Sequence, residues 1–174
     1  MGTKKYRLTE NHINIGNRIL YQIEALKDFG DVKAGDLGGH IESEKNLAQE
    51  NSAWVYDDAK VYGNAKVCDD ACVCGNAKVY GNAKVYGEAE VHDNAKVYGG
   101  AEVYGRACVY GNAEVCGNAK VCDDASIYGN ARVCDDAEVY GDACVYDNAE
   151  VYGDACVYDN DGNIMVYFLP KIVE

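Results

Sequence analysis

Apolar and polar positions follow a six-residue pattern through most of this chain. Valine recurs at every sixth position from Val55 to Val157, with Ile127 as the single substitution, and alanine stands two residues before each of these positions. Because alternate residues of a strand point to opposite faces, Ala and Val share one face and their neighbours share the other. The last two positions of each repeat are mostly Gly, Asp and Asn, which tolerate a tight turn. Each repeat therefore predicts a short strand followed by a corner.

The repeats predict a three-sided coil. Eighteen of them run from 53 to 160 without insertion or deletion, and three consecutive repeats, with three strands and three corners, make one turn. Six such coils, stacked at a strand spacing of about 4.8 Å, give a rod roughly 29 Å long. An α-helix would show no continuous apolar stripe with this spacing, and collagen or a pentapeptide solenoid would need a different period. We therefore predict an all-β protein with a single-stranded parallel β-helix.

The pattern resembles the hexapeptide-repeat family of left-handed β-helices, in which a small residue follows an aliphatic one after four positions. The segment LKDFGDVKAGDLGGHIESE, from Leu26 to Glu44, and its continuation to Val55 are similar to the YdcK-type proteins of bacteria and phages. This resemblance implies a left-handed coil and, for function, only a loose transferase label. The acyltransferases of the wider family act as trimers with a His at the subunit boundary and often a protruding loop. No loop interrupts residues 53–160 here.

Both ends of the rod need a cover, because an open β-helix exposes unpaired strand edges. Residues 1–52 predict an N-terminal cap, with a β-hairpin formed by 6–9 and 18–26 and a degenerate coil in which Ile41 and Leu47 are in register with Ala53. Residues 161–174 predict a capping or oligomerisation strand, since a turn signal at 160–163 precedes the apolar run 164–169.

Charge and cysteine content limit the partners and the compartment. The net charge is −13, and residues 107–160 hold 2 basic against 11 acidic groups, which disfavours nucleic acid and anionic membranes as partners. The N-terminus has no signal-type apolar segment and the chain has no membrane-spanning run, so we expect a cytoplasmic protein. Nine cysteines, several at positions that Tyr fills elsewhere in the repeat, favour reduced thiols over a disulfide framework.

Outward residues at the same position of successive coils should stack in columns, and many of them are tyrosines. Such columns stiffen a face, and tyrosine is also frequent in protein interfaces. The residues that we expect at an interface are Tyr80, Tyr98, Tyr110, Tyr128, Tyr146, Tyr167 and Phe168.

One outward cluster has the chemistry of a metal site. Thiols, imidazole and carboxylate are zinc ligands, and adjacent coils place five of them near one another, namely Cys72, Cys74, Glu90, His92 and Cys108. Flat sheet faces splay their side chains, so we expect no metal, and this cluster is the candidate if one binds. His92 is likewise the candidate catalytic base in the array, although no orienting partner or cleft is evident for it. We expect a backbone role in a turn for His40. Cys116 and Cys134 should lie near enough to form a disulfide by oxidation in air.

The sequence thus predicts a non-enzymatic structural or binding module without a cofactor, which displays tyrosine-rich and acidic faces for self-association or protein docking. A homo-oligomer is compatible with this prediction. Two alternatives stay open. One is an acyltransferase that uses acetyl-CoA in an intersubunit groove, and the other is an acidic decoy that occupies a basic protein.

Overall fold

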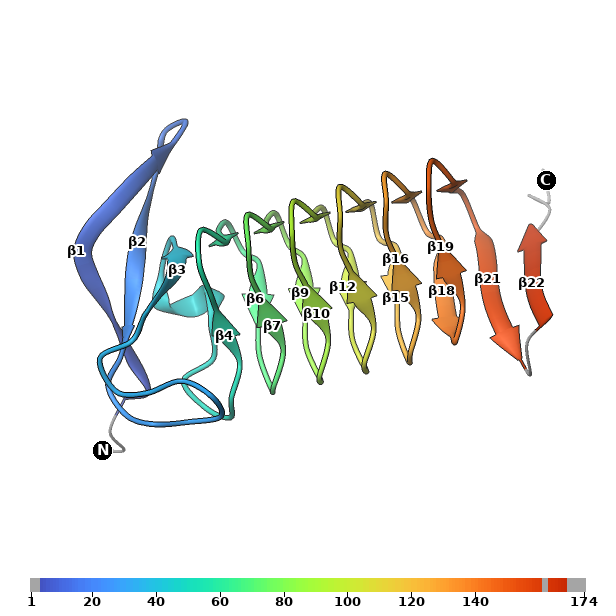
Figure 1. The fold of residues 1–174 in the computed structure, drawn as a ribbon. Coiled ribbons are helices and arrows are strands. Elements are labelled where there is room, and N and C mark those ends of the chain that lie inside the picture. The colour runs from blue at the N-terminus through green and yellow to red at the C-terminus, as the bar shows by residue number, and fades with distance from the viewer. Residues whose placement is uncertain (1–3, 161–162, 169–174) are drawn as a thin grey trace.

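The protein is a straight three-sided rod, with an antiparallel hairpin at one end and an antiparallel strand pair at the other (Figure 1). The computed structural model describes residues 4–160 and the backbone of 163–168. The predicted all-β fold of stacked parallel coils is confirmed. Among the described residues, helix is limited to the single 3-10 turn η1 (Glu44–Asn46).

Three sheets form the walls of the rod. The lysine wall joins β1 (Tyr6–Ile15), β2 (Arg18–Ala25) and β3 (Leu37–Ile41) to β5 (Lys60–Val61), β8 (Lys78–Val79), β11 (Lys96–Val97), β14 (Glu114–Val115), β17 (Arg132–Val133) and β20 (Glu150–Val151). The tyrosine–cysteine wall comprises β4 (Trp54–Val55), β7 (Cys72–Val73), β10 (Glu90–Val91), β13 (Cys108–Val109), β16 (Ser126–Ile127) and β19 (Cys144–Val145). The mixed-charge wall comprises β6 (Lys66–Val67), β9 (Lys84–Val85), β12 (Glu102–Val103), β15 (Lys120–Val121), β18 (Glu138–Gly141), β21 (Ala155–Asn160) and β22 (Asn163–Phe168).

The register between coils is three hexads throughout the array. Val91, for example, pairs with Val73 on one side and with Val109 on the other. Backbone N–H groups donate to carbonyl oxygens of the next coil, as Cys74 does to Val91 at 2.9 Å. Outward side chains of successive coils are therefore held directly above one another.

Alanine and valine fill the interior, as the repeat predicts. Nearly all of them in the array are fully buried, and Val91 and Ala95 have an exposed fraction of 0%. Each buried Val contributes roughly 1.5 kcal/mol by leaving water. The small Ala side chain leaves room for Val within a narrow triangular cross-section.

The residue with positive φ at each corner of the array is Gly or Asp. Both residue types have positive φ there, such as +58° at Asp123 and +68° at Gly141. Each of five corner aspartates accepts a hydrogen bond at its carboxylate from the N–H of a Gly one coil later, with distances of 3.1–3.2 Å. The five are Asp57, Asp69, Asp93, Asp123 and Asp135. This contact stabilises a left-handed backbone that costs a non-Gly residue about 1–2 kcal/mol.

Buried polar side chains cover the first coil. Lys5 is completely buried, and its ammonium donates to the carbonyl oxygen of Ala53 at 2.8 Å, while burial lowers its pKa to about 8. Asn46 donates to the carbonyl oxygens of Gly63 and Ala65 at 3.1 and 2.9 Å. These side chains donate hydrogen bonds to carbonyl oxygens of the first coil, which has no regular preceding coil whose N–H groups could donate to them.

The N-terminal segment differs in two details of its strands from the sequence prediction. The first hairpin strand extends to Ile15 instead of ending near residue 9. After a register shift that follows Leu8, the polar stretch pairs with the second strand, and the chain turns tightly only at Gly16 (φ +59°). Ile41 and Leu47 pair with Val61 and Val67, which places them at the Val position of the preceding coil and not at the Ala position.

His40 lies in β3 and not in a turn. The preceding glycines are required by packing, since a Cβ at Gly38 would lie 2.5 Å from the Val55 carbonyl oxygen. Burial lowers the pKa of His40.

At the other end, β22 pairs antiparallel with β21 across the predicted turn, from Asn160↔Asn163 to Ala155↔Phe168. The side chains of residues 160–174 lie outside the described part of the protein. No helix in the described ranges has the length and apolar composition that crossing a membrane requires.

Candidate functional site

The predicted tyrosine columns are present. Tyr80 stacks on Tyr62 and Tyr98 with ring centroids 5.1 and 5.0 Å apart and nearly parallel planes. On the tyrosine–cysteine wall, Tyr128 stacks on Tyr110 at 5.0 Å and on Tyr146 at 5.4 Å. Stacked pairs of this kind contribute about 0.5–1.5 kcal/mol each, so the columns stiffen the rod.

The three walls differ in charge. On the lysine and mixed-charge walls, Lys and Glu one coil apart form ion pairs of 2.8–2.9 Å, namely Lys84–Glu102, Lys96–Glu114 and Lys120–Glu138. The tyrosine–cysteine wall has no charged strand residue between Cys108 and Tyr146. We call its outward residues there the uncharged patch, which consists of Tyr110, Ser126, Tyr128, Cys144 and Tyr146. Interfaces are depleted of charge at their centre and enriched in tyrosine, and this patch has that composition.

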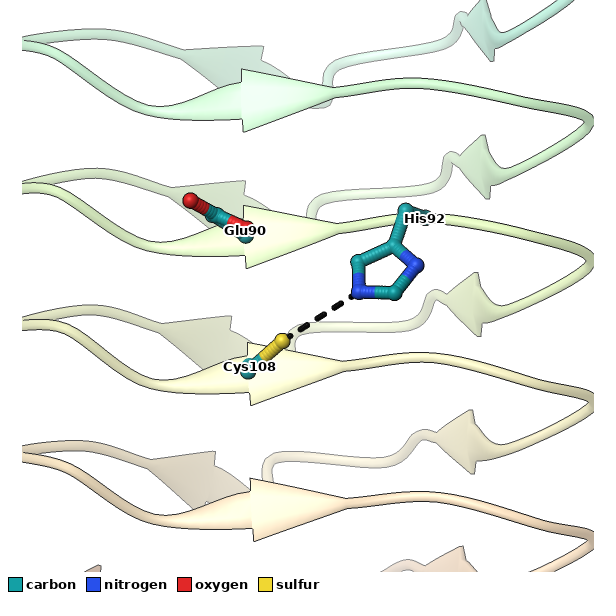
Figure 2. A group of neighbouring side chains, drawn as sticks. All are labelled: Glu90, His92 and Cys108. Carbon is teal, nitrogen blue, oxygen red and sulfur yellow. Dashed lines mark hydrogen bonds between the residues drawn. The ribbon is translucent and has the colours of Figure 1, made fainter.

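Next to the uncharged patch, three side chains of different chemistry meet. Glu90 and His92 lie on one coil and Cys108 on the next, and Figure 2 shows the imidazole directed at the thiol. Nε2 of His92 is 3.4 Å from Sγ of Cys108. One ligand atom from each of the three residues lies within 4.8 Å of the others.

The histidine of this cluster is held on both sides. Its ring stacks on Tyr110 at 4.9 Å with an interplanar angle of 10°. Its other nitrogen, Nδ1, lies 3.4 Å from Oδ1 of Asp93. The hydrogen bond from the Gly111 N–H, together with that from His92, lowers the pKa of Asp93 and keeps it a carboxylate. The repeat places Tyr110 next to His92 in one outward column, and the structure shows that contact, whereas sequence reasoning missed Asp93, which follows His92 directly in the chain.

The other two predicted thiols lie one coil earlier. Cys72 is the rung neighbour of Glu90. Its hydrogen bond with Cys74 lowers the pKa of Cys74 and raises that of Cys72. Both line a depression of about 310 Å³ together with Asp31 of the N-terminal segment. Burial is the main cause that raises the pKa of Cys108 to about 11.

A second hollow was not expected from the sequence. It has a volume of about 530 Å³ and lies between the hairpin residues Asn14 and Ile15 and the outward column Lys60, Lys78 and Lys96. The spacing of the repeat could have identified the lysine column, but nothing in the repeat indicates that the hairpin leans over it. Lys96 forms an ion pair with Glu114, so Lys60 and Lys78 are the lysines that favour an anion in this hollow.

One pair of cysteines departs from the expectation of reduced thiols. Cys116 and Cys134, whose Cα atoms are 4.5 Å apart on adjacent coils, are joined by a disulfide. The other seven cysteines are free. Two of the expected interface residues, Tyr167 and Phe168, have side chains outside the described residues, and the interface role of the others stays a prediction.

Part of the chain is similar in sequence to a known protein. A 62-residue stretch is 44% identical to the "Uncharacterized acetyltransferase YdcK" of Escherichia coli (strain K12), and it covers 31% of this chain and 19% of that protein. The matched part thus spans about a fifth of the relative's length. No family model matches the chain. The six-residue period and the constant register of the three walls show that the chain is a parallel β-helix built from hexapeptide repeats, and part of it is similar to this relative.

Proposed function

We propose that the chain is a non-enzymatic binding module that associates with a second copy of itself through the uncharged patch. The observation that carries this proposal is the contrast between walls, because one wall lacks charge over three successive coils while the other two are lined with ion pairs. A symmetric contact brings the same residues of both copies together. Tyrosine suits such a contact, since its hydroxyl donates and accepts hydrogen bonds and its ring stacks.

Other features support this function. Interior Ala and Val side chains fill the axis of the rod, and the coil from 53 to 160 has no inserted loop that would shape a substrate cleft. The surplus of acidic groups in residues 107–160 disfavours nucleic acid and anionic membranes as partners. Seven free thiols favour the cytoplasm as the compartment.

Replacement of Tyr128 by Glu tests the patch. We expect Tyr128→Glu to weaken association at least about 30-fold, or about 2 kcal/mol, because a carboxylate would be buried at the centre of the contact. Tyr104→Glu is the matched control, since Tyr104 stacks on Tyr86 at 4.9 Å on the mixed-charge wall. Sedimentation equilibrium at several concentrations measures both variants.

Salt separates self-association from the docking of a basic protein. Added salt screens repulsion between acidic halves and should tighten the contact between two copies, whereas it weakens attraction to a basic partner. A strictly monomeric wild type at all salt concentrations, or equal effects of the two Glu substitutions, would refute the proposal. Salt-sensitive binding to a basic protein by a monomer would instead favour the acidic decoy.

The acyltransferase alternative has its own support in the relative's name and in the lysine column, which could bind the phosphates of acetyl-CoA. We expect acetyl-CoA to leave the melting temperature unchanged, because the proposed module does not bind it. Binding at a hundredfold excess over Kd would instead add about 2.7 kcal/mol of stability and raise the melting temperature. Differential scanning fluorimetry measures this. A rise in melting temperature that Lys78→Gln removes and Lys66→Gln retains would favour the enzyme.

A further inference from the structure

We propose that Glu90, His92 and Cys108 bind one zinc ion on the tyrosine–cysteine wall, at the N-terminal border of the uncharged patch. This site is independent of self-association. It has three protein ligands from two coils, and water completes a tetrahedral set. A thiolate, an imidazole nitrogen and a carboxylate oxygen are the donors that zinc accepts, and a mixed set of this kind suits zinc better than calcium or magnesium, which prefer oxygen.

The separation of the nitrogen and sulfur atoms fits one shared ion. Zinc–sulfur and zinc–nitrogen bonds of about 2.3 and 2.0 Å at a tetrahedral angle place the two donor atoms about 3.5 Å apart. Nε2 of His92 and Sγ of Cys108 are 3.4 Å apart. A carboxylate oxygen of Glu90 lies within 4.8 Å of a ring nitrogen of His92 and of the Cys108 sulfur, and the exposed Glu90 side chain would rotate toward them to bind the same ion.

The surroundings of His92 match those of a metal ligand. Histidines that bind metals usually donate their second ring N–H to a carboxylate, which fixes the tautomer and the ring orientation. Asp93 is that carboxylate, at 3.4 Å from Nδ1, and the stacked Tyr110 ring fixes the ring plane. Nε2 is therefore left with its lone pair directed at the Cys108 side.

Charge balance around Glu90 also calls for a cation. The array residues Glu102, Glu114 and Glu138 each have a Lys one coil away as an ion-pair partner. Glu90 has Cys72 and Cys108 as its rung neighbours instead. Zinc would neutralise the carboxylate and the thiolate together, and Cys108 would release its proton to solvent on binding.

Titration of the untagged, chelator-treated full chain with Co²⁺ and then Zn²⁺ tests the site. We expect one Co²⁺ per chain, with a thiolate-to-cobalt charge-transfer band in the near ultraviolet that one equivalent of Zn²⁺ abolishes. His92→Gln and Cys108→Ser should each weaken binding by more than about 100-fold, beyond the usual effect of an outer partner. Asp93→Asn should weaken it about 10- to 100-fold.

Two variants serve as matched controls. Cys144 occupies the same outward column as Cys108 two coils later and is an exposed free thiol, and His12 is an exposed histidine of the hairpin. Cys144→Ser and His12→Gln should bind Co²⁺ as the wild type does. Circular dichroism checks that all variants fold, which is expected because the substituted side chains point outward. The proposal is overturned if the wild type binds neither ion, if its cobalt spectrum lacks the thiolate band, or if His92→Gln and Cys108→Ser retain wild-type affinity.

Discussion

Val67→Asp should unfold the N-terminal coils of the array. Val67 is 1% exposed in the interior of the rod, where it belongs to a continuous cluster of buried apolar side chains. Burial of an unpaired charge is among the most destabilising single changes, and we expect a loss of at least about 4 kcal/mol. Guanidinium unfolding followed by circular dichroism measures the loss.

The neighbouring residue provides the control. Lys66 is the other residue of β6, and its side chain is exposed on the outer face. Lys66→Asp introduces the same carboxylate one position away and should change stability by less than about 0.5 kcal/mol. Similar losses for the two variants would contradict the assignment of inner and outer faces.

Gly117→Ala should destabilise the rod by about 2–5 kcal/mol, because it combines left-handed strain of about 1–2 kcal/mol with an overpacking cost of about 1–3 kcal/mol. Gly117 has φ +68°, and a Cβ there would lie 2.6 Å from the backbone nitrogen of Asp135 on the next coil. Thermal unfolding followed by circular dichroism measures the change.

Gly153→Ala separates these two contributions. Gly153 occupies the same corner column two coils later with the same φ of +68°, but a Cβ there meets no atom of the described residues within 4 Å. It should cost only the strain, about 1–2 kcal/mol. If the two variants melt at the same temperature, contact between successive corners does not limit the choice of residue at Gly117.

The sequence predicts the array because one physical rule repeats. Ala and Val at a spacing of two can only share a face, and a turn after every sixth residue then fixes a coil of three hexads. Residues three hexads apart, such as Tyr62 and Tyr80, are therefore predicted to be column partners, and the structure places their ring centroids 5.1 Å apart.

The cap and the site contacts do not follow from that rule. Capping by the ammonium of Lys5 depends on how a non-repeating segment folds back over Ala53. The contact between His92 and Cys108 runs diagonally between two coils, because outward side chains lean toward the next coil. The same diagonal joins Tyr86 to Glu102 and Tyr98 to Glu114. The expectation that outward side chains of a flat wall lie parallel therefore underestimates how closely side chains of adjacent coils approach one another.

The order of Asp and Gly at the corners constrains how the molecule can change in length. Removal of a single hexad between Asp123 and Gly141 would move every later side chain to the adjacent wall, and would place Asp123 beneath a residue other than the Gly that binds it. Removal or duplication of three hexads leaves each column intact. The length of the rod can thus change only by whole coils, which moves its two ends apart or together in steps of about 4.8 Å.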